Sequence, residues 1–442
     1  MRALFEKSLG VLTAGCLSLF AASLYVLPAQ AVEIQKVVSP GGIEAWLVED
    51  HTIPQIAVNF SFNGGAAQDP KGKEGLTRLL AATLDEGAGD LPSQAFQARL
   101  EELAVTISFD AGKDRFYGNL RTLTPTRDEA FELLHLALTK PRFDAEAVGR
   151  MKAQLISSAK RNAEDADAIA ALSYTEAALG DHPYARPTGG TPESLETLTP
   201  EDLVQQHKRL VARSDLTIGV VGAIDAKTLA SLLDRVFADL PEDGDLSAIP
   251  EVMAKTGLQV SKSLQVPQTT LMFGLPGLKR DDPDYQAAYV MNHILGGGSF
   301  TSWLYEEVRE KRGLAYGVNT SLIPYDHMGL VLGSTATRAD RADETLKIVL
   351  EQIDRMATKG PTQAELDSAK RYLTGSYALR FDSSGKIASQ LVALQNADLG
   401  IDYFDRRNSE IEAVTLDDVN RVAQRLLAGK EPTVVSVGPA TD

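Results

Sequence analysis

Four pairs of similar segments recur along this chain at nearly one spacing, and this repeat is the strongest constraint on its fold. The pairs are residues 53–55 with 266–268 and 69–70 with 282–283, each 213 residues apart, and 198–203 with 414–419 and 216–222 with 432–438, each 216 residues apart. Four pairs of similar segments with nearly the same spacing are not expected by chance. The repeat therefore predicts a duplicated domain.

Each half shows the same order of expected elements. Period-two strands come first, then helices, a strand pair, a helical block and a buried strand that ends in glycine. In the first half, residues 105–109 and 115–120 are expected to form a hairpin, and helices are expected to fill much of 127–178. Strands grouped with strands and helices grouped with helices predict an α+β fold rather than an alternating α/β fold.

An acidic stretch interrupted by proline and glycine separates the two halves. It runs from Leu240 to Pro250 and is typical of a linker. We therefore predict an N-terminal domain at 32–240, a linker at 241–255 and a C-terminal domain at 256–442.

Residues 1–31 have the pattern of an export signal. Arg2 and Lys7 give a basic start, residues 9–27 are apolar, and an Ala-Gln-Ala sequence that ends at Ala31 fits a cleavage site. We predict a signal peptide that is cleaved after Ala31 and export to the periplasm. An uncleaved membrane anchor is the alternative, because the apolar run is about long enough to span a bilayer.

The cysteine content bears on disulfide bonds, and the net charge bears on the possible partners. Cys16 lies within the signal segment, and Thr13 stands where a lipidation signal has leucine, so the mature chain is expected to contain no cysteine. The formal net charge is −16 at pH 7. Such an acidic surface argues against nucleic acid and anionic membranes as partners.

A glycine-rich stretch in the second half leads into a short helical segment. Three consecutive glycines, 296–298, permit unusual backbone conformations and close approach of another chain. Leu304 and Val308 are four residues apart, on one face of the helix that follows. Arg309 and Tyr316 then lie on either side of the end of this helix, where two large hydrogen-bonding side chains can hold a peptide carbonyl.

Residues 304–316, Leu-Tyr-Glu-Glu-Val-Arg-Glu-Lys-Arg-Gly-Leu-Ala-Tyr, resemble the C-terminal-domain signature of the pitrilysin, insulinase and mitochondrial-processing-peptidase family. In that family an arginine and a tyrosine seven residues apart hold the scissile peptide at the zinc site, and Arg309 and Tyr316 have this spacing. Trp303 departs from the family, whose members usually carry arginine there. The resemblance covers nearly all of 33–438 and implies two homologous α+β domains, each a mainly antiparallel sheet packed with helices, that form half of a clamshell.

The resemblance also assigns a role to the glycine-rich loop, as a segment that contacts the substrate. The loop residues concerned are Gly296, Gly297, Gly298, Ser299 and Phe300. Nucleotide binding is disfavoured, because a phosphate loop needs a Gly-Lys-Ser/Thr ending, whereas a purely structural loop stays an alternative. For Arg309 the alternative is an ordinary surface ion pair in a charged helix.

The family's zinc motif, His-x-x-Glu-His, is missing from the matching helix. Its positions fall on Arg78, Ala81 and Ala82, and neither arginine nor alanine offers a neutral nitrogen ligand or a carboxylate base. The family's third ligand, a glutamate, would fall within 154–157, where the sequence has no carboxylate. No two of the six histidines are three or four residues apart. We predict that this chain binds no zinc and no other cofactor.

The resemblance therefore implies a division of roles between two chains. We predict a non-catalytic subunit of a heterodimeric zinc metallopeptidase, inactive alone, whose homologous partner supplies the zinc and the glutamate base. Arg309 and Tyr316 would bind the substrate peptide and stabilise the tetrahedral intermediate. Two alternatives stay open: a non-enzymatic peptide-binding or scaffold protein, as a homodimer or a lone clamshell, and a peptidase with unexpected metal ligands.

Overall fold

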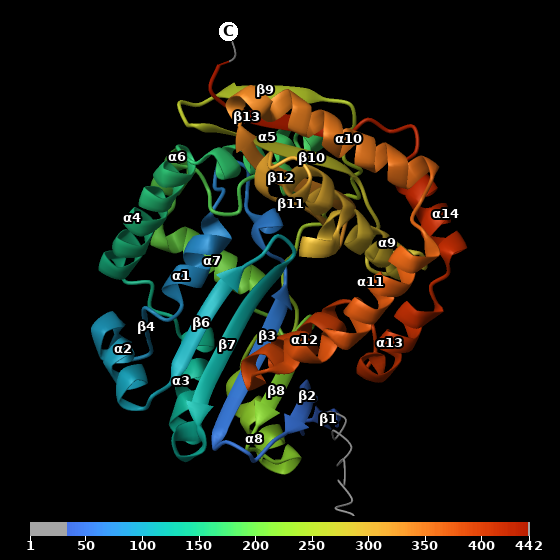
Figure 1. Cartoon of the computed structure of the whole chain (residues 1–442). Coiled ribbons are helices and arrows are strands. Elements are labelled where there is room, and N and C mark those ends of the chain that lie inside the picture. Colours follow the sequence, from blue (N-terminus) through green and yellow to red (C-terminus); the bar gives the residue numbers. More distant parts are fainter. Residues whose placement is uncertain (1–32, 441–442) are drawn as a thin grey trace, which may run out of the picture. The chain divides into compact units, whose positions relative to one another are not determined.

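Two β-sheets, one from each half of the repeat, organise the chain (Figure 1). The computed structural model describes residues 33–440, so the predicted signal segment 1–31, with its cleavage site and Cys16, lies outside the described residues. Both sheets belong to one compact unit that begins at Ile34.

The first sheet has six strands in the order β1-β2-β8-β3-β7-β6. Their bounds are β1 (Gln35–Val38), β2 (Glu44–Glu49), β3 (Gln55–Asn63), β6 (Thr106–Ala111), β7 (Arg115–Leu123) and β8 (Thr217–Gly222). Neighbouring strands are antiparallel except β2 and β8, which run parallel. β6 and β7 form the hairpin expected from the sequence. A short separate ribbon pairs β4 (Gly87–Ala88) with β5 (Leu91–Pro92).

The second sheet repeats this topology with five strands in the order β11-β12-β10-β13-β9. Their bounds are β9 (Gln259–Ser263), β10 (Gln268–Pro276), β11 (Ala315–Tyr325), β12 (Met328–Arg338) and β13 (Thr433–Gly438). Again only one pair, β13 with β9, is parallel. In both sheets the hairpin lies beside the first long strand, which pairs with the last strand of that half. The fold-class prediction is confirmed, whereas the exact domain boundaries stay a prediction.

Most helices of each half pack on that half's own sheet or on one another. The first half contributes α1 (Leu76–Thr83), α2 (Ser93–Glu102), α3 (Arg127–Thr139), α4 (Ala145–Asn162), α5 (Ala166–Leu179), α6 (Pro192–Glu196), α7 (Pro200–Leu210) and α8 (Ala226–Phe237). The second contributes α9 (Tyr285–Asn292), α10 (Ala342–Thr358), α11 (Gln363–Gly375), α12 (Ser384–Asn396), α13 (Tyr403–Ala413) and α14 (Leu416–Leu427). Within residues 33–440, none of the helices combines the length and the apolar character needed to cross a membrane.

Two helices pack against the sheet of the other half. Leu391 of α12 lies in one buried cluster with Val221 of β8, and Tyr174 of α5 lies in another with Val435 of β13. Figure 1 shows α12 across the first sheet and α5 beside β10 and β13. Because this exchange covers the second face of each sheet, β10 is buried at seven consecutive positions instead of alternating.

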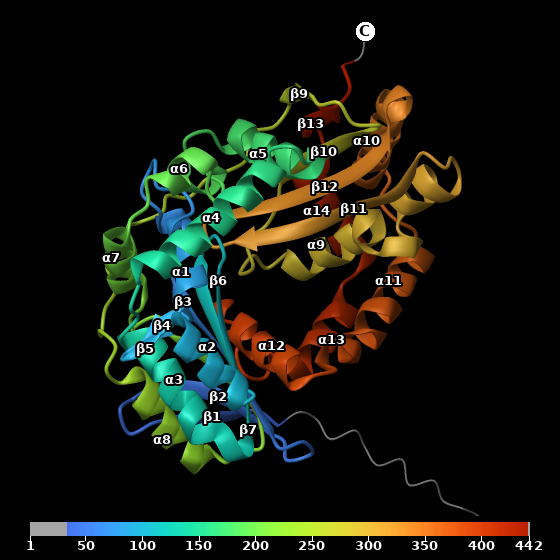
Figure 2. The ribbon, with the colours of Figure 1, turned by 90° about the vertical axis from the view of Figure 1, so that its left-hand side faces the viewer.

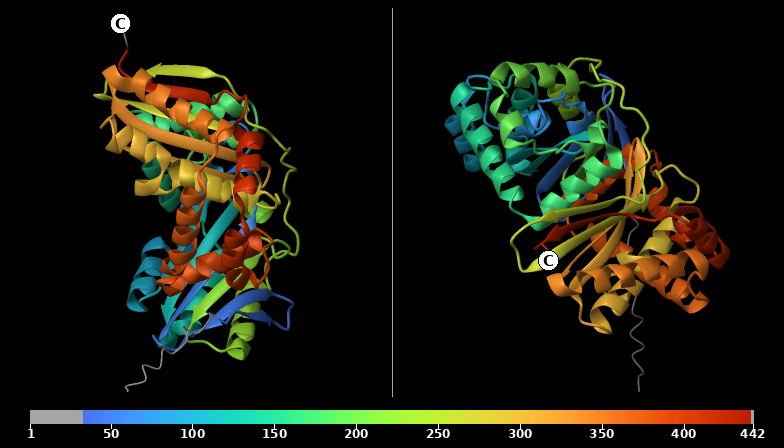
Figure 3. Two further views of the ribbon diagram at one scale, coloured as in Figure 1. Left: turned by 45° about the vertical axis from the view of Figure 1, so that its right-hand side comes forward. Right: turned by 90° about the horizontal axis from the view of Figure 1, so that it is seen from above.

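The predicted linker is a fixed part of the structure. Residues 241–255 form no helix or strand, and Figure 3 shows them as coil. The side chain of Gln68 exchanges two hydrogen bonds with the backbone of Ser247, at 2.9 and 2.8 Å, and Lys255 N–H donates to the carbonyl of Ala178 at 2.9 Å. These contacts attach the segment to the first half.

The repeated segments 198–203 and 414–419 begin two equivalent helices, α7 and α14, with the same cap. At α14, Thr415 Oγ1 accepts a hydrogen bond from the backbone N–H of Asp418 at 3.1 Å, and the Asp418 carboxylate accepts one from Thr415 N–H at 3.0 Å. α7 has the same reciprocal pair between Thr199 and its third helical residue. The repeat thus preserves a capping box, which satisfies backbone donors that a helix start leaves free.

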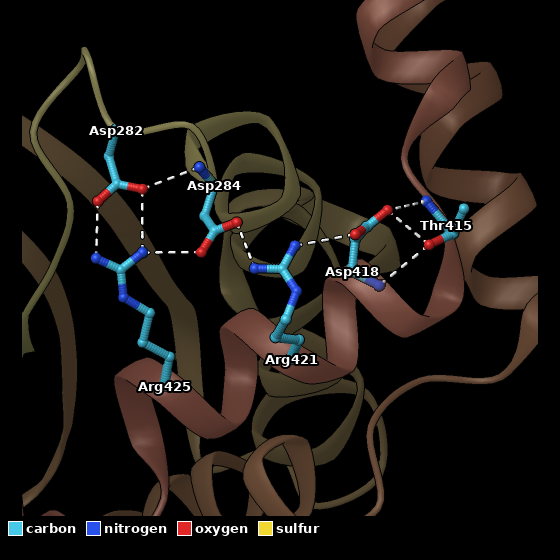
Figure 4. A network of polar contacts seen from close by, with 6 residues as sticks. All are labelled: Asp282, Asp284, Thr415, Asp418, Arg421 and Arg425. Carbon is cyan, nitrogen blue, oxygen red and sulfur yellow. Dashed lines mark hydrogen bonds and ion pairs between the residues drawn. The ribbon is translucent and has the colours of Figure 1, made fainter.

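An ion-pair network fixes α14 to the loop between β10 and α9 (Figure 4). Arg421 bridges Asp418, at 2.9 Å, and Asp284. Arg425 donates to Asp282 and to Asp284, at 2.8 Å each. The network therefore joins the loop that follows β10 to the helix that precedes the last strand of this half.

Asp418→Asn is expected to destabilise the protein at neutral pH, and the effect should shrink below about pH 4. Hydrogen bonds from Thr415, and then from Arg421, lower the pKa of Asp418 from 3.8 to about 2. A carboxyl group with a depressed folded-state pKa contributes stability above its unfolded pKa, and that stability is lost as the pH falls through the folded value. The expected loss at pH 7 is about 1 kcal/mol, as for other helix caps.

Urea unfolding at several pH values measures this difference. Asp417→Asn is the matched control, because Asp417 is exposed on the same helical turn. Equal losses in the two variants, or a difference that persists unchanged at low pH, would contradict the assignment.

Candidate functional site

Arg309 and Tyr316 come from two irregular stretches of backbone. Arg309 lies in η6 (Tyr305–Glu310), a π-helical segment rather than the α-helix that the sequence predicts. Tyr316 lies near the start of β11, where the register against β12 shifts between Ala315 and Val318. Such π-helical turns and β-bulges re-aim side chains and are frequent at functional sites.

The two side chains meet in a cluster of aromatic rings near the surface. The Arg309 guanidinium carbon lies 4.5 Å from the centroid of the Tyr316 ring and 4.9 Å from that of Tyr305. The Tyr305 ring in turn contacts that of Phe300 edge-on, with 5.0 Å between centroids. Tyr316 is 85% exposed and Phe300 is 74% exposed. We call these four residues the Arg309 cluster; the sequence pointed to three of them and missed Tyr305.

The neighbouring charges in η6 and directly after it pair with one another, and Arg309 forms only a weak ion contact. Lys311 lies 2.6 Å from Glu307, which also pairs with Arg312. The ion contact of Arg309 is with Glu310 at 3.9 Å. Because cation–π stacking uses the faces of the guanidinium, its edge N–H groups are left for other acceptors.

The glycine-rich loop precedes the Arg309 cluster and is tightly packed. A Cβ atom would contact Thr320 Oγ1 at Gly296, lie 2.7 Å from Asn292 Nδ2 at Gly297, and lie 2.7 Å from the His293 carbonyl oxygen at Gly298. None of the three glycines has a positive φ, whereas Ser299 has φ 45°. Close packing within this chain, rather than an unusual backbone angle, is therefore the reason for the glycines.

Trp303, the departure from the family signature, is part of the core. It is 3% exposed, its indole N–H donates to Glu365 at 2.7 Å, and the Arg355 guanidinium lies 3.7 Å above its ring. These contacts fix the segment between the glycine loop and η6 to the core of the second half.

The positions of the zinc motif carry no ligand set. Arg78, on α1, forms an ion pair with Asp110 of β6, and Ala81 is buried. Residues 154–157 lie on α4, which packs beside α1. Within residues 33–440, no group of three or more His, Cys, Asp or Glu side chains is placed to hold a metal ion. The side chains at this site do not fit zinc.

A cavity of about 750 Å³ is lined by residues of the first sheet and of helices of the second half. Figure 2 shows one of these helices, α12, beside the first sheet. Arg309 and Tyr316 do not line the cavity. Its lining includes the arginines Arg280, Arg380 and Arg407 and the tyrosines Tyr285, Tyr289, Tyr377 and Tyr403. Sequence reasoning missed these residues, because they come from separate segments whose spacing follows no motif.

Comparison with known proteins finds the same architecture in one protein family. The family profile described as the peptidase M16 inactive domain matches residues 197–373. The crystal structure of a peptidase M16 inactive domain from Pseudomonas fluorescens is similar, with a TM-score of 0.87 and 30% sequence identity, over 92% of this chain and 98% of that one.

Two relatives extend the comparison over most of the chain. A Helicobacter pylori protein named non-peptidase homolog YmxG is 28% identical over 383 residues, 84% of this chain and 86% of the relative. An uncharacterized zinc protease of Streptomyces coelicolor is 23% identical over 423 residues, 92% of this chain and 90% of the relative.

The fold and the altered zinc-motif positions together define a protein with the architecture of this peptidase class and without metal ligands at Arg78, Ala81 and Ala82. The chain belongs to the peptidase M16 family. The resemblance drawn from residues 304–316 is thereby confirmed.

Proposed function

We propose that this chain is the non-catalytic subunit of a two-chain zinc peptidase, in which a homologous partner supplies the zinc and the glutamate base. One observation carries the proposal: Arg309 is stacked on a highly exposed Tyr316 in a chain whose zinc-motif positions carry arginine and alanine instead of metal ligands. Hydrogen-bond donors exposed in this way are suited to a reaction centre that another chain completes.

In the proposed mechanism, Arg309 and Tyr316 hold the scissile carbonyl of a peptide. The partner's base activates a water, and negative charge develops on the carbonyl oxygen during attack. The Arg309 N–H groups and the Tyr316 hydroxyl donate hydrogen bonds to that oxygen, and pre-oriented donors stabilise the developing charge. The bound peptide adds as a strand to a sheet edge; β11, which carries Tyr316, is the outermost strand of its sheet.

The proposal includes the place where the chain acts. The export-signal pattern of residues 1–31 supports export to the periplasm and release by cleavage after Ala31. The partner is then an exported homologue with an intact His-x-x-Glu-His motif.

The purified chain alone is expected to contain substoichiometric zinc and to cleave no peptide. The physical reason is the absence of ligands at the zinc-motif positions Arg78, Ala81 and Ala82. Elemental analysis and a quenched-fluorescence peptide assay test this directly, before and after addition of the co-purifying partner from the native source. One tightly held zinc per chain, or peptidase activity without a partner, would overturn the proposal.

A non-enzymatic peptide-binding or scaffold protein is the second candidate. It is supported by the 28%-identical Helicobacter pylori relative, whose name describes a non-peptidase. Under this function the chain binds peptide while no partner with peptidase activity co-purifies. Co-purification from the native source, followed by the same peptidase assay, therefore distinguishes the two candidate functions.

A further inference from the structure

We propose that the cavity between the two halves binds the carboxylate group of a peptide segment, through Arg280, Arg380 and Arg407. We call this cavity the arginine cavity. It is separate from the Arg309 cluster, since no residue of that cluster lines it. Its volume of about 750 Å³ suits a short peptide segment.

The first argument is that the three arginines lack carboxylate partners. Arg407 is 4% exposed, and it donates to the Leu373 carbonyl and to Asn408 Oδ1, at 2.9 Å each. Arg280 donates to the Tyr403 hydroxyl at 2.7 Å, and Arg380 donates to a tyrosine hydroxyl at 3.2 Å. Among residues 33–440, none of the three forms an ion pair.

This arrangement is unusual in an acidic protein. The chain has 60 acidic and 44 basic residues, so carboxylates are abundant. A buried cation without a counter-charge costs free energy of desolvation. Arg407 is such a cation, and it shares the cavity with the half-buried Arg280 and the exposed Arg380. Together the three arginines are expected to attract an anion from outside the chain.

The second argument is how tyrosines hold the guanidinium groups. The Arg280 guanidinium carbon lies 4.3 Å from the Tyr285 ring centroid, and that of Arg407 lies 4.1 Å from the Tyr377 ring centroid. Burial raises the pKa of both tyrosines, so they stay neutral and do not compensate the positive charge. Stacking fixes the planes of the guanidinium groups, whose N–H edges match the two oxygens of a carboxylate.

The third argument is that the acidic residues of the cavity already have partners. Asp110 pairs with Arg78, and Asp326 pairs with Arg115. Asp114 accepts hydrogen bonds from the Tyr184 hydroxyl and, at 3.1 Å, from the backbone N–H of Asp326. The uncompensated charge of the cavity is thus positive, while the nearby carboxylates repel a ligand with many negative charges, such as a polyphosphate.

The surrounding backbone favours a peptide as the bearer of the carboxylate. The outermost strands of both sheets, β6 and β11, contribute cavity residues, among them Asp110 of β6 and Tyr325 of β11. Unpaired edges of strands bind extended peptide backbone. A peptide can therefore place a carboxylate among the arginines and hydrogen bond to a strand edge.

Isothermal titration of the chain with four probes tests the proposal. The probes are acetyl-Ala-Ala-Glu-Ala-amide, acetyl-tetra-alanine with a free C-terminus, acetyl-Ala-Ala-Lys-Ala-amide and inorganic phosphate. Saturable binding of the glutamate peptide assigns a side-chain carboxylate, and saturable binding of the second probe assigns a C-terminal one. The lysine peptide is expected not to bind, because the uncompensated charge is positive.

Arg380→Ala is expected to weaken binding of the carboxylate peptide by at least about tenfold, because hydrogen bonds between charged groups are strong. Arg380 is exposed, so its removal leaves the core intact. Arg371→Ala, at an exposed arginine of α11 that does not line the cavity, is the matched control and should bind like wild type. Arg407→Lys keeps the buried charge and is expected to lose affinity without unfolding, as judged by thermal melting.

Four results would overturn the proposal. They are no saturable binding of either carboxylate peptide at millimolar concentration, equal binding of the lysine peptide, unchanged affinity in Arg380→Ala, and tighter binding of phosphate than of both carboxylate peptides. Because the Arg309 cluster lies outside the cavity, each of these results leaves the proposed role of Arg309 and Tyr316 intact.

Discussion

Arg309→Ala in the assembled two-chain enzyme is expected to lower kcat by about 10²–10³-fold, the usual cost of removing a donor to the oxyanion of a tetrahedral intermediate. The guanidinium is stacked on the exposed ring of Tyr316 and the buried ring of Tyr305, and it is weakly paired with Glu310. Arg309 itself is not part of the buried core, so its loss is expected to leave the chain folded. Tyr316→Phe is expected to act in the same direction, since it removes the hydroxyl and keeps the ring. Steady-state kinetics with the reconstituted pair measures both effects.

Arg312→Ala is the matched control, because Arg312 follows η6 and is engaged with Glu307. It should retain wild-type turnover. Thermal melting of each variant shows whether the chain is still folded. Wild-type kcat in both Arg309→Ala and Tyr316→Phe would remove the catalytic role and favour the scaffold function.

Gly219→Ala is expected to lower the free energy of unfolding by about 3 kcal/mol, at the upper end of what overpacking a core usually costs. Gly219 lies in β8 beneath α12, and a Cβ atom there would be 2.5 Å from the carbonyl oxygen of Ala388 and 2.7 Å from Leu391 Cβ. Backbone cannot yield as a flexible side chain does. The methyl group therefore forces α12 away from the first sheet.

Gly385→Ala tests the same chemical change on α12 itself. Nothing lies within 4 Å of a Cβ at Gly385, so alanine should be neutral or stabilise the helix by up to about 1 kcal/mol. Urea denaturation of both variants gives the comparison. A loss in Gly385→Ala equal to that in Gly219→Ala would contradict the prediction that the loss at Gly219 comes from its close contact with α12.

Much of the fold could be predicted because its signals are local. Period-two runs marked the hairpin of β6 and β7, and the repeated Thr-x-x-Asp segments proved to be capping boxes at the starts of α7 and α14. The zinc-motif positions could also be judged without a structure, because a side chain such as Ala81 has no donor atom wherever it lies.

The candidate site was predictable only in part. The seven-residue spacing drew attention to Arg309 and Tyr316, but spacing does not reveal that a π-helical segment and a β-bulge bring their side chains into contact. Tyr305 joins the cluster through that same irregular backbone. The sequence predicted that the glycines of the loop allow unusual backbone conformations. Their close packing against neighbours such as Asn292 depends on tertiary contacts, which the sequence does not show.

By itself, the sequence determined that the chain is a duplicated α+β protein without a zinc motif, because repeats, periodicity and ligand chemistry are properties of residue order. Only the tertiary structure decided that α5 and α12 each cover the sheet of the other half, and that arginines from three segments surround one cavity. The physical reason is that the apolar face of a helix shows in the sequence which side of the helix must be buried, whereas the sheet that buries it depends on how the chain folds.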